Sequence, residues 1–124
     1  MRNDIAILIV EPAGALAQAL SDFFAEQGFN TIFTKTLKDT LLTLQNQRAD
    51  VLILDADLLE DDFAFIPIIK GMEVDLPIII CAETNTPELE SKIRHQGIFY
   101  YHIKSFGTQD LEMAISNAVY KLSQ

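Results

Sequence analysis

The chain has 124 residues, 49% of them hydrophobic, and carries a formal net charge of −9 with a sequence pI of about 4.4. Its length fits a single domain, residues 1–124, and its composition is that of a globular protein rather than a disordered one. The acidic balance argues against direct nucleic-acid binding, because a phosphate backbone would repel the chain and no basic stripe compensates.

The single cysteine and the short apolar runs bear on the cellular compartment in which the protein functions. Cys81 lies within the apolar run 77–81, so a disulfide framework is excluded and a reducing, cytoplasmic setting is expected. No apolar stretch approaches the ~20 residues of a membrane span, so we expect no membrane association. The six apolar residues before Glu11 are too few for a secretory signal.

Apolar runs and helical patterns alternate along the whole chain. The expected elements are, in chain order, strand 5–10, helix 13–27, strand 29–33, helix 36–48, strand 51–54, a weaker helix 62–71, strand 77–81, helix 86–96, strand 98–103 and helix 108–123. Several runs are apolar at every position, as in strands covered on both faces. This alternation predicts an α/β fold with a parallel sheet and helices on both faces.

Local signals support several helix boundaries. Gly28 is a good C-terminal stop for the helix over 13–27. Thr86 and Pro87 fit the N-cap and the first position of the helix that follows, and Thr108 is expected to cap the last helix. Pro67 must lie in an early turn of the weaker helix or bend it.

Polar residues stand where the expected strands end. Glu11 follows the first strand, Asp55 the third and Lys104 the fifth, and the fourth strand ends around Cys81, Ala82 and Glu83. In open parallel sheets, ligands bind beyond the carboxyl ends of the strands. Two carboxylates and an amine gathered there would suit a small anion and a divalent cation.

These segments resemble the receiver domain of the response regulators of bacterial two-component signalling, over nearly the whole chain. The matching segments are ILIVE (7–11), ADVLILD (49–55), LPIII (76–80) and GIFYYHIKSF (97–106). The resemblance implies a flavodoxin-like, doubly wound sheet of five parallel strands in the order 2-1-3-4-5. It also implies a signalling domain, not an enzyme, whose partner is a histidine kinase or a phosphotransfer protein.

The resemblance assigns roles to particular residues. Asp55 would be the phosphoacceptor and Lys104 would pair with the phosphoryl oxygens. Glu11, Asp55 and the backbone carbonyl of Asp57 would bind Mg²⁺. Tyr101 would be the aromatic residue whose rotation reports the switch.

The sequence departs from the family pattern at several of these positions. Pro12 stands where a second acid, the more direct metal ligand, is expected, which would weaken Mg²⁺ binding. Ala82 stands at the switch position where a Ser or Thr hydroxyl normally bonds the phosphoryl group, and a one-residue shift would offer Cys81 instead. Ser105 replaces the usual proline after the lysine, and Phe63 replaces a glycine.

Three functions therefore stay open. The first is a working receiver with a weakened Mg²⁺ site. The second is a degenerate receiver that acts as an interaction module without phosphorylation. The third and most remote is a phosphatase, because Asp55 and Asp57 resemble the DxD nucleophile motif of haloacid-dehalogenase-like enzymes.

Other residues carry weaker expectations. Asp62 is expected to cap the helix after it, and Glu60 and Asp61 to form a solvated loop. Four aromatic residues lie on the fifth strand and last helix: Phe99, Tyr100, Tyr101 and Tyr120. They indicate either ordinary packing or a homodimer surface on helix 86–96, strand 98–103 and helix 108–123, a face that the family commonly uses. His95 and His102 are most simply a surface histidine at a helix end and one on an edge strand, rather than metal ligands.

Overall fold

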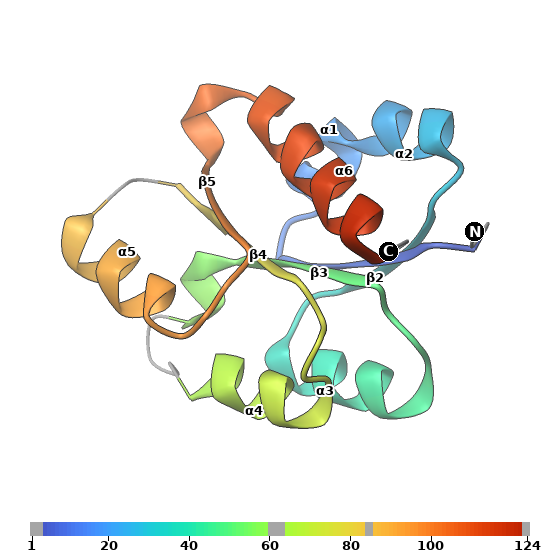
Figure 1. The fold of residues 1–124 in the computed structure, drawn as a ribbon. Helices are drawn as coiled ribbons and strands as arrows, with labels where there is room; N and C mark the ends of the chain where they lie inside the picture. Colours follow the sequence, from blue (N-terminus) through green and yellow to red (C-terminus); the bar gives the residue numbers. More distant parts are fainter. Residues whose placement is uncertain (1–3, 60–63, 84–85, 123–124) are drawn as a thin grey trace.

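The computed structural model describes residues 4–59, 64–83 and 86–122, and their strands form one five-stranded parallel sheet. The strand order is β2-β1-β3-β4-β5, which confirms the expected doubly wound architecture (Figure 1). The strands are β1 (Ala6–Val10), β2 (Asn30–Thr34), β3 (Val51–Asp55), β4 (Ile78–Ala82) and β5 (Tyr100–Ile103).

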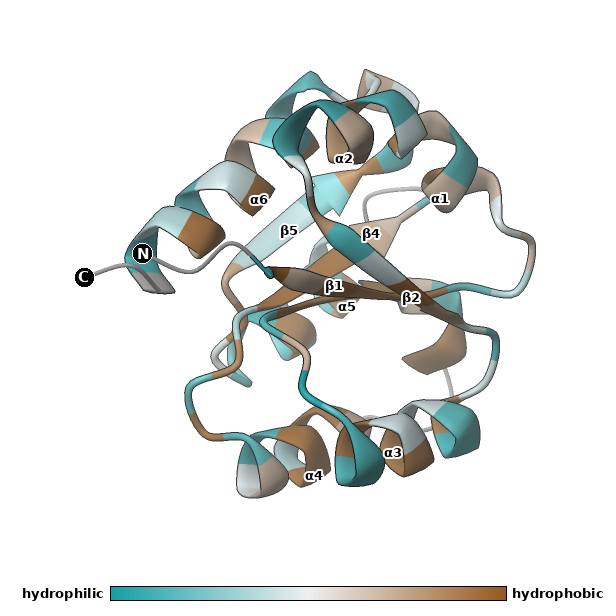
Figure 2. Ribbon diagram, turned by 90° about the vertical axis from the view of Figure 1, so that its right-hand side faces the viewer, coloured by the Kyte–Doolittle hydropathy of each residue, from teal (hydrophilic) through white to brown (hydrophobic). Residues whose placement is uncertain are grey.

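Helices cover both faces of the sheet. The α-helices are α1 (Ala15–Ala19), α2 (Ser21–Gln27), α3 (Leu37–Asn46), α4 (Phe65–Met72), α5 (Pro87–Arg94) and α6 (Gln109–Leu122), and the short 3₁₀ helices are η1 (Ala56–Leu59) and η2 (Lys104–Phe106). One layer holds α1, α2 and α6, and the opposite layer holds α3, α4 and α5 (Figure 1). The apolar side of the helices faces the sheet (Figure 2).

Alternation along each strand divides the core in two. On β3, Leu52 and Leu54 join the cluster beneath α3, α4 and α5, whereas Val51 and Ile53 join the cluster beneath α1, α2 and α6. Successive strand residues point to opposite faces of a sheet, so a strand buried on both sides is apolar throughout. β3 and β4 are buried at every position. Their last residues therefore lie at the edge of a rigid scaffold.

The expected helix over 13–27 is wrong as a single element, because it divides at Leu20. Leu20 is fully buried and has φ −98° and ψ 0°, outside the helical range. The hydroxyl of the next residue, Ser21, donates to the carbonyl of Gln18 at 3.0 Å, a local bond that competes with the helical pattern. Gly28 ends α2 in the left-handed conformation, with φ 72°, as its sequence position predicted.

The remaining boundaries differ from expectation by a few residues, as helix and strand ends often do. Pro67 is the third residue of α4, in the first turn, where a missing N–H costs no helical hydrogen bond. Thr86 occupies the N-cap of α5 but its side chain makes no capping bond. The Thr108 hydroxyl donates to Glu112 Oε2 at 2.8 Å. The expectations for Glu60, Asp61, Asp62 and Phe63 lie outside the described residues.

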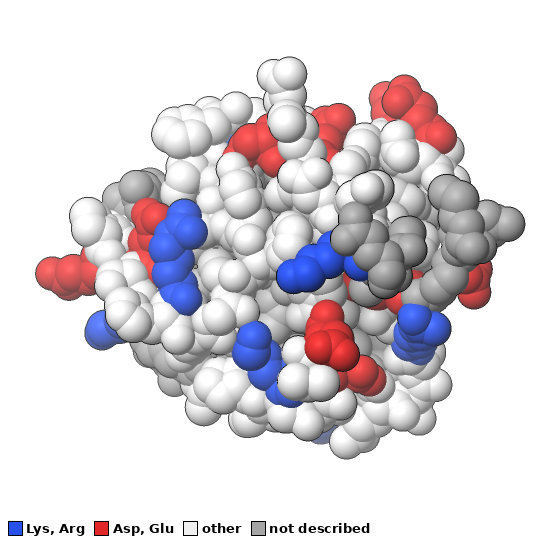
Figure 3. Space-filling model, in the orientation of Figure 1, with Lys and Arg blue, Asp and Glu red and all other residues white. Residues whose placement is uncertain are grey.

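The distribution of surface charge and the length of the helices can be compared with what the sequence predicts. On the face seen in Figure 3, acidic and basic side chains are interspersed and no single basic patch forms. None of the helices in the described part of the chain is both long enough and apolar enough to cross a membrane.

Candidate functional site

Asp55 is the last residue of β3 and is only 4% exposed. Its Oδ2 accepts a hydrogen bond from Lys104 Nζ at 2.8 Å, and its Oδ1 accepts one from the backbone N–H of Asp57 at 3.0 Å. Both carboxylate oxygens are therefore held in place. The sequence-predicted nucleophile and amine meet at the carboxyl edge of the sheet, 49 residues apart in the chain.

The ion pair shifts the titration of Lys104. Burial alone would lower the pKa of this amine, but the hydrogen bond and charge of Asp55, with the charges of Glu83 and Asp57, raise it above its ordinary value of 10.5. Glu83 Oε2 lies 3.8 Å from Lys104 Nζ. The amine stays charged at neutral pH and faces two carboxylates, so it can receive the negative oxygens of a phosphoryl group.

Glu11 directly follows β1 and is 2% exposed. Its Oε1 accepts a hydrogen bond from the backbone N–H of Ala17 at 3.1 Å, in the first turn of α1. The side chain thus satisfies a free N–H group of this helix, a structural role that the sequence did not reveal. Its backbone N–H donates to the Thr34 carbonyl at 3.1 Å, which extends the β1–β2 pairing.

The oxygen donors at this edge fit Mg²⁺ in part. Within 4–59, 64–83 and 86–122, no three His, Cys, Asp or Glu residues come together as a metal site. Mg²⁺ prefers oxygen ligands and is often held by only one or two carboxylates, with waters and phosphate oxygens completing its shell. Glu11 and Asp55 satisfy that minimal requirement, whereas Pro12 is exposed and supplies no carboxylate.

Neither of the last two residues of β4, Cys81 and Ala82, carries a hydroxyl. Ala82 is the last residue of this strand and is 2% exposed, on the side of the sheet covered by α3, α4 and α5. Cys81 pairs in register with Asp55 and belongs to the opposite core cluster. Burial raises the pKa of the Cys81 thiol, with opposing effects from Lys104 and the nearby acids, so it stays protonated. Neither position supplies the alcohol that the family pattern calls for.

Tyr101 points inward, away from solvent. It is 5% exposed, and among the described residues its buried hydroxyl has no hydrogen-bond partner. Burial and the charge of Glu90 raise the pKa of Tyr101, opposed by Arg94. The Arg94 guanidinium lies over the ring, 5.5 Å from its centre, and its Nε donates to Glu90 Oε2 at 2.6 Å. The expected switch residue is thus packed beneath a side chain of α5.

A second polar cluster on β5 was missed by the sequence analysis. Tyr100 Oη and His102 Nδ1 both bond to Asp110 Oδ2 of α6, at 2.8 and 3.0 Å. Burial alone would raise the pKa of Asp110, but the bonds from His102 and Tyr100 hold it below its ordinary value. His102 is on the edge strand as expected, but it is 1% exposed because it packs under α6. The period-two spacing of Tyr100, His102 and Lys104 is the signal that could have revealed a shared face.

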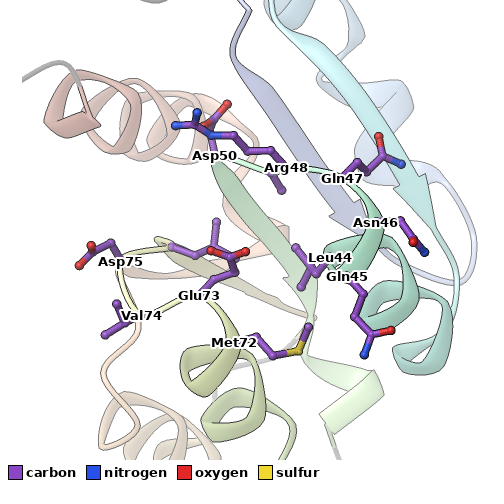
Figure 4. A pocket seen from close by; sticks show the side chains of 12 residues that line it. Leu44, Gln45, Asn46, Gln47, Arg48, Asp50, Met72, Glu73, Val74 and Asp75 are labelled. Atoms are coloured by element: carbon purple, nitrogen blue, oxygen red, sulfur yellow. The ribbon is translucent and has the colours of Figure 1, made fainter.

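The opposite edge of the sheet holds a cavity of about 620 Å³ between the ends of α3 and α4. Figure 4 shows Arg48 lying alongside Asp50 at one side of it. The buried Asp50 carboxylate accepts hydrogen bonds from the Ala6 N–H at 2.9 Å and from Arg48 Nε at 3.1 Å. These bonds connect the start of β1 to the loop before β3, so Arg48 and Asp50 serve the fold.

Comparison with known proteins agrees with this geometry. The family model of the response regulator receiver domain matches residues 7–116. The chain is 27% identical over 120 residues to the probable transcriptional regulator ycf29 of Guillardia theta, an alignment covering 97% of this chain and 55% of that protein. The chain therefore spans about half the length of this curated relative.

Solved structures share the fold. A two-component response regulator from Clostridium difficile superposes with a TM-score of 0.84 at 17% identity, covering 97% of this chain and 99% of that one. A response regulator from Thermotoga maritima, solved in complex with Mg(2+)-BeF, superposes with a TM-score of 0.76 at 18% identity, covering 92% and 98%.

Proposed function

The chain belongs to the response regulator receiver domain family, and on that premise we propose that Asp55 accepts a phosphoryl group from a histidine kinase or a phosphotransfer protein. The observation that carries this proposal is the 2.8 Å contact between Lys104 Nζ and the nearly buried Asp55 carboxylate. An amine fixed beside a carboxylate at a strand end can stabilise charge that develops on a transferring group.

The transfer is a simple displacement at phosphorus. A carboxylate oxygen of Asp55 attacks the phosphorus of a phosphohistidine on the partner, the P–N bond breaks, and the departing imidazole takes up a proton. Lys104 pairs with the phosphoryl oxygens as its contact with the Asp55 oxygen is lost. The Asp57 N–H, already aimed at Asp55, remains a donor at the same position.

Mg²⁺ would supply charge neutralisation between Asp55 and the anionic donor. We propose that Glu11, Asp55 and the backbone carbonyl of Asp57 hold it, and that it binds weakly. Two features support a weak site: Pro12 contributes no carboxylate, and Glu11 already accepts a backbone hydrogen bond. In this proposal the domain is a phosphoacceptor and not a turnover enzyme. Steady hydrolysis of an aryl phosphate that depends on Asp55 would contradict it.

A second function, that of an interaction module without phosphorylation, is favoured by two specific observations. Ala82 offers no hydroxyl, and Tyr101 is already buried beneath Arg94. A phosphoryl group on Asp55 would therefore find no hydroxyl at Ala82 to bond. The hydrogen bond that usually moves the end of β4 toward the phosphoryl group would not form. Under this alternative the face formed by α5, β5 and α6 keeps one arrangement whatever the state of Asp55.

Intact mass spectrometry after incubation with acetyl phosphate and Mg²⁺ distinguishes the two functions. We expect a single phosphoryl adduct on the wild-type chain and on Asp39→Asn, a control that removes an exposed carboxylate of α3. We expect none on Asp55→Asn, which keeps the size of the side chain but lacks the nucleophile. Lack of any adduct at millimolar Mg²⁺ would support the interaction module.

We also propose a homodimer through the face of α5, β5 and α6. Phe99 and Tyr100 prove to be packed between the sheet and α6, and Tyr101 packs on the other side, so these three rings serve the core. The exposed apolar side chains that support the dimer are instead on η2 and α6: Phe106, Met113 and Tyr120, which are 76%, 63% and 67% exposed.

A further inference from the structure

A cavity of about 420 Å³ lies at the amino edge of β4 and β5, across the sheet from Asp55. Its walls come from the α4–β4 connection, the segment before β5 and the C-terminal half of α6. Most of its described lining residues are apolar in type: Val74, Leu76, Pro77, Ile78, Ile98, Phe99 and Ala118. Its size and apolar walls are those of a small-molecule site, which usually adds a few placed polar groups.

Two lysines from different helices converge on one wall of this cavity. Lys70 Nζ of α4 donates to the Gly97 carbonyl at 2.9 Å. Lys121 Nζ of α6 lies 6.0 Å from the centre of the Phe99 ring, two residues further on. Both ammonium groups are thus placed along the segment 97–99, and both lysines are among the residues that line the cavity.

Gly97 makes this approach close. It has φ +79°, a conformation that side chains rarely adopt, and a Cβ at this position would lie 3.0 Å from Lys70 Nζ. The glycine therefore lets the ammonium group rest against the backbone. That contact uses one of the three N–H donors of Lys70 and leaves the others for a ligand.

Among the residues that the structure describes, no acid lies within ion-pair distance of either amine. Arg48, Arg94 and Lys104 are ion-paired, whereas neither Lys70 nor Lys121 forms an ion pair within the part of the chain that the structure describes. Both lie in the last turn of their helices, where a cation also interacts favourably with the helix dipole. The helix dipole explains their positions along the helices, but not why both amines line one apolar cavity. Among the described residues, Asp75 is the one carboxylate on the cavity lining.

From this juxtaposition we propose that the cavity binds a small organic anion, a carboxylate or phosphate carried on an apolar body. The apolar walls take the body, and Lys70 and Lys121 take the charge. Asp75 opposes the anion and moderates its affinity. The cavity is separate from the phosphorylation site, because Asp55 and the cavity lie at opposite edges of the sheet, roughly 13 to 17 Å apart for strands of this length.

The test is an NMR titration of backbone amides with three probes that share one body and differ in charge: naphthoate, naphthamide and naphthylmethylammonium. We expect naphthoate to bind most tightly and the ammonium most weakly, with shifts centred on Gly97, Ile98 and Phe99. Salt should weaken naphthoate alone. Equal affinity for the three probes, shifts centred elsewhere, or no saturation below about 10 mM naphthoate would overturn the proposal.

Charge variants sharpen the test. Lys70→Gln and Lys121→Gln should each weaken naphthoate roughly fivefold, the effect of one charge contact at ~4 Å in water, and leave naphthamide unchanged. Asp75→Asn should strengthen naphthoate. Lys38→Gln, on the exposed side of α3, is the matched control and should change nothing. Equal losses of naphthoate affinity for Lys70→Gln and Lys38→Gln would show a general charge effect and would contradict the assignment of Lys70 to the anion site.

Discussion

At the scale of single residues, the site depends on one amine shared by carboxylates. Lys104 donates to Asp55 and lies 3.8 Å from Glu83, and its pKa is raised above 10.5 by these partners. Because the pKa rises on folding, Lys104 contributes stability that is fully present below pH 10.5 and is lost as the pH rises through its folded-state pKa.

This predicts a lysine-specific alkaline loss of stability. We expect the free energy of unfolding, measured with urea from about pH 8 to about pH 11, to fall more steeply for the wild-type chain than for Lys104→Met. Lys38→Met, an exposed lysine of α3, serves as control and should follow the wild type. Parallel curves for all three chains would mean that Asp55 and Lys104 do not interact in solution.

At the scale of elements, β5 joins the site to α6. Lys104 follows β5 and reaches Asp55, while Tyr100 and His102 of the same strand bond to Asp110 in the first turn of α6. The pKa of Asp110 is lowered on folding, so its contribution to stability is present above its ordinary value of 3.8 and is lost as the pH falls through the folded-state pKa.

Asp110→Asn should therefore loosen α6. We expect a loss of about 1 kcal/mol in the free energy of unfolding at neutral pH, at the lower end for such bonds because the side chain is 36% exposed. The loss should shrink as the pH is lowered toward the range where the wild-type carboxylate is protonated. Ser116→Ala, on the exposed side of the same helix, is the control. An equal loss in the free energy of unfolding for Asp110→Asn and Ser116→Ala would contradict a specific contribution from the hydrogen bonds of Asp110.

The sequence predicted the elements and the strand-end residues because both follow from local patterns. Apolar runs specify buried strands, and the carboxyl edge of a parallel sheet brings Asp55 and Lys104 together. What it could not predict depends on side-chain geometry across the fold. Glu11 turns to the N–H of Ala17, and the histidine expected simply on an edge strand, His102, is buried by α6.

At the scale of the whole molecule, a net charge of −9 opposes the proposed dimer and the apolar side chains of α6 favour it. We expect light scattering to show a mass that rises with protein concentration, and more strongly at high salt because repulsion is screened. Met113→Lys should abolish the rise, whereas Val74→Lys, a control that charges an exposed apolar residue elsewhere, should not. A monomer at every accessible concentration and salt would rule out the dimer.

The most direct measurement of the central claim is the rate of Asp55 phosphorylation by acetyl phosphate as Mg²⁺ is increased, followed by intact mass. We expect the wild-type rate to keep rising through the millimolar range, and Pro12→Asp to reach its maximum at lower Mg²⁺ because it restores a carboxylate beside Glu11. An adduct that persists in Asp55→Asn, or none in either the wild type or Pro12→Asp, would contradict a phosphoacceptor with a weakened metal site.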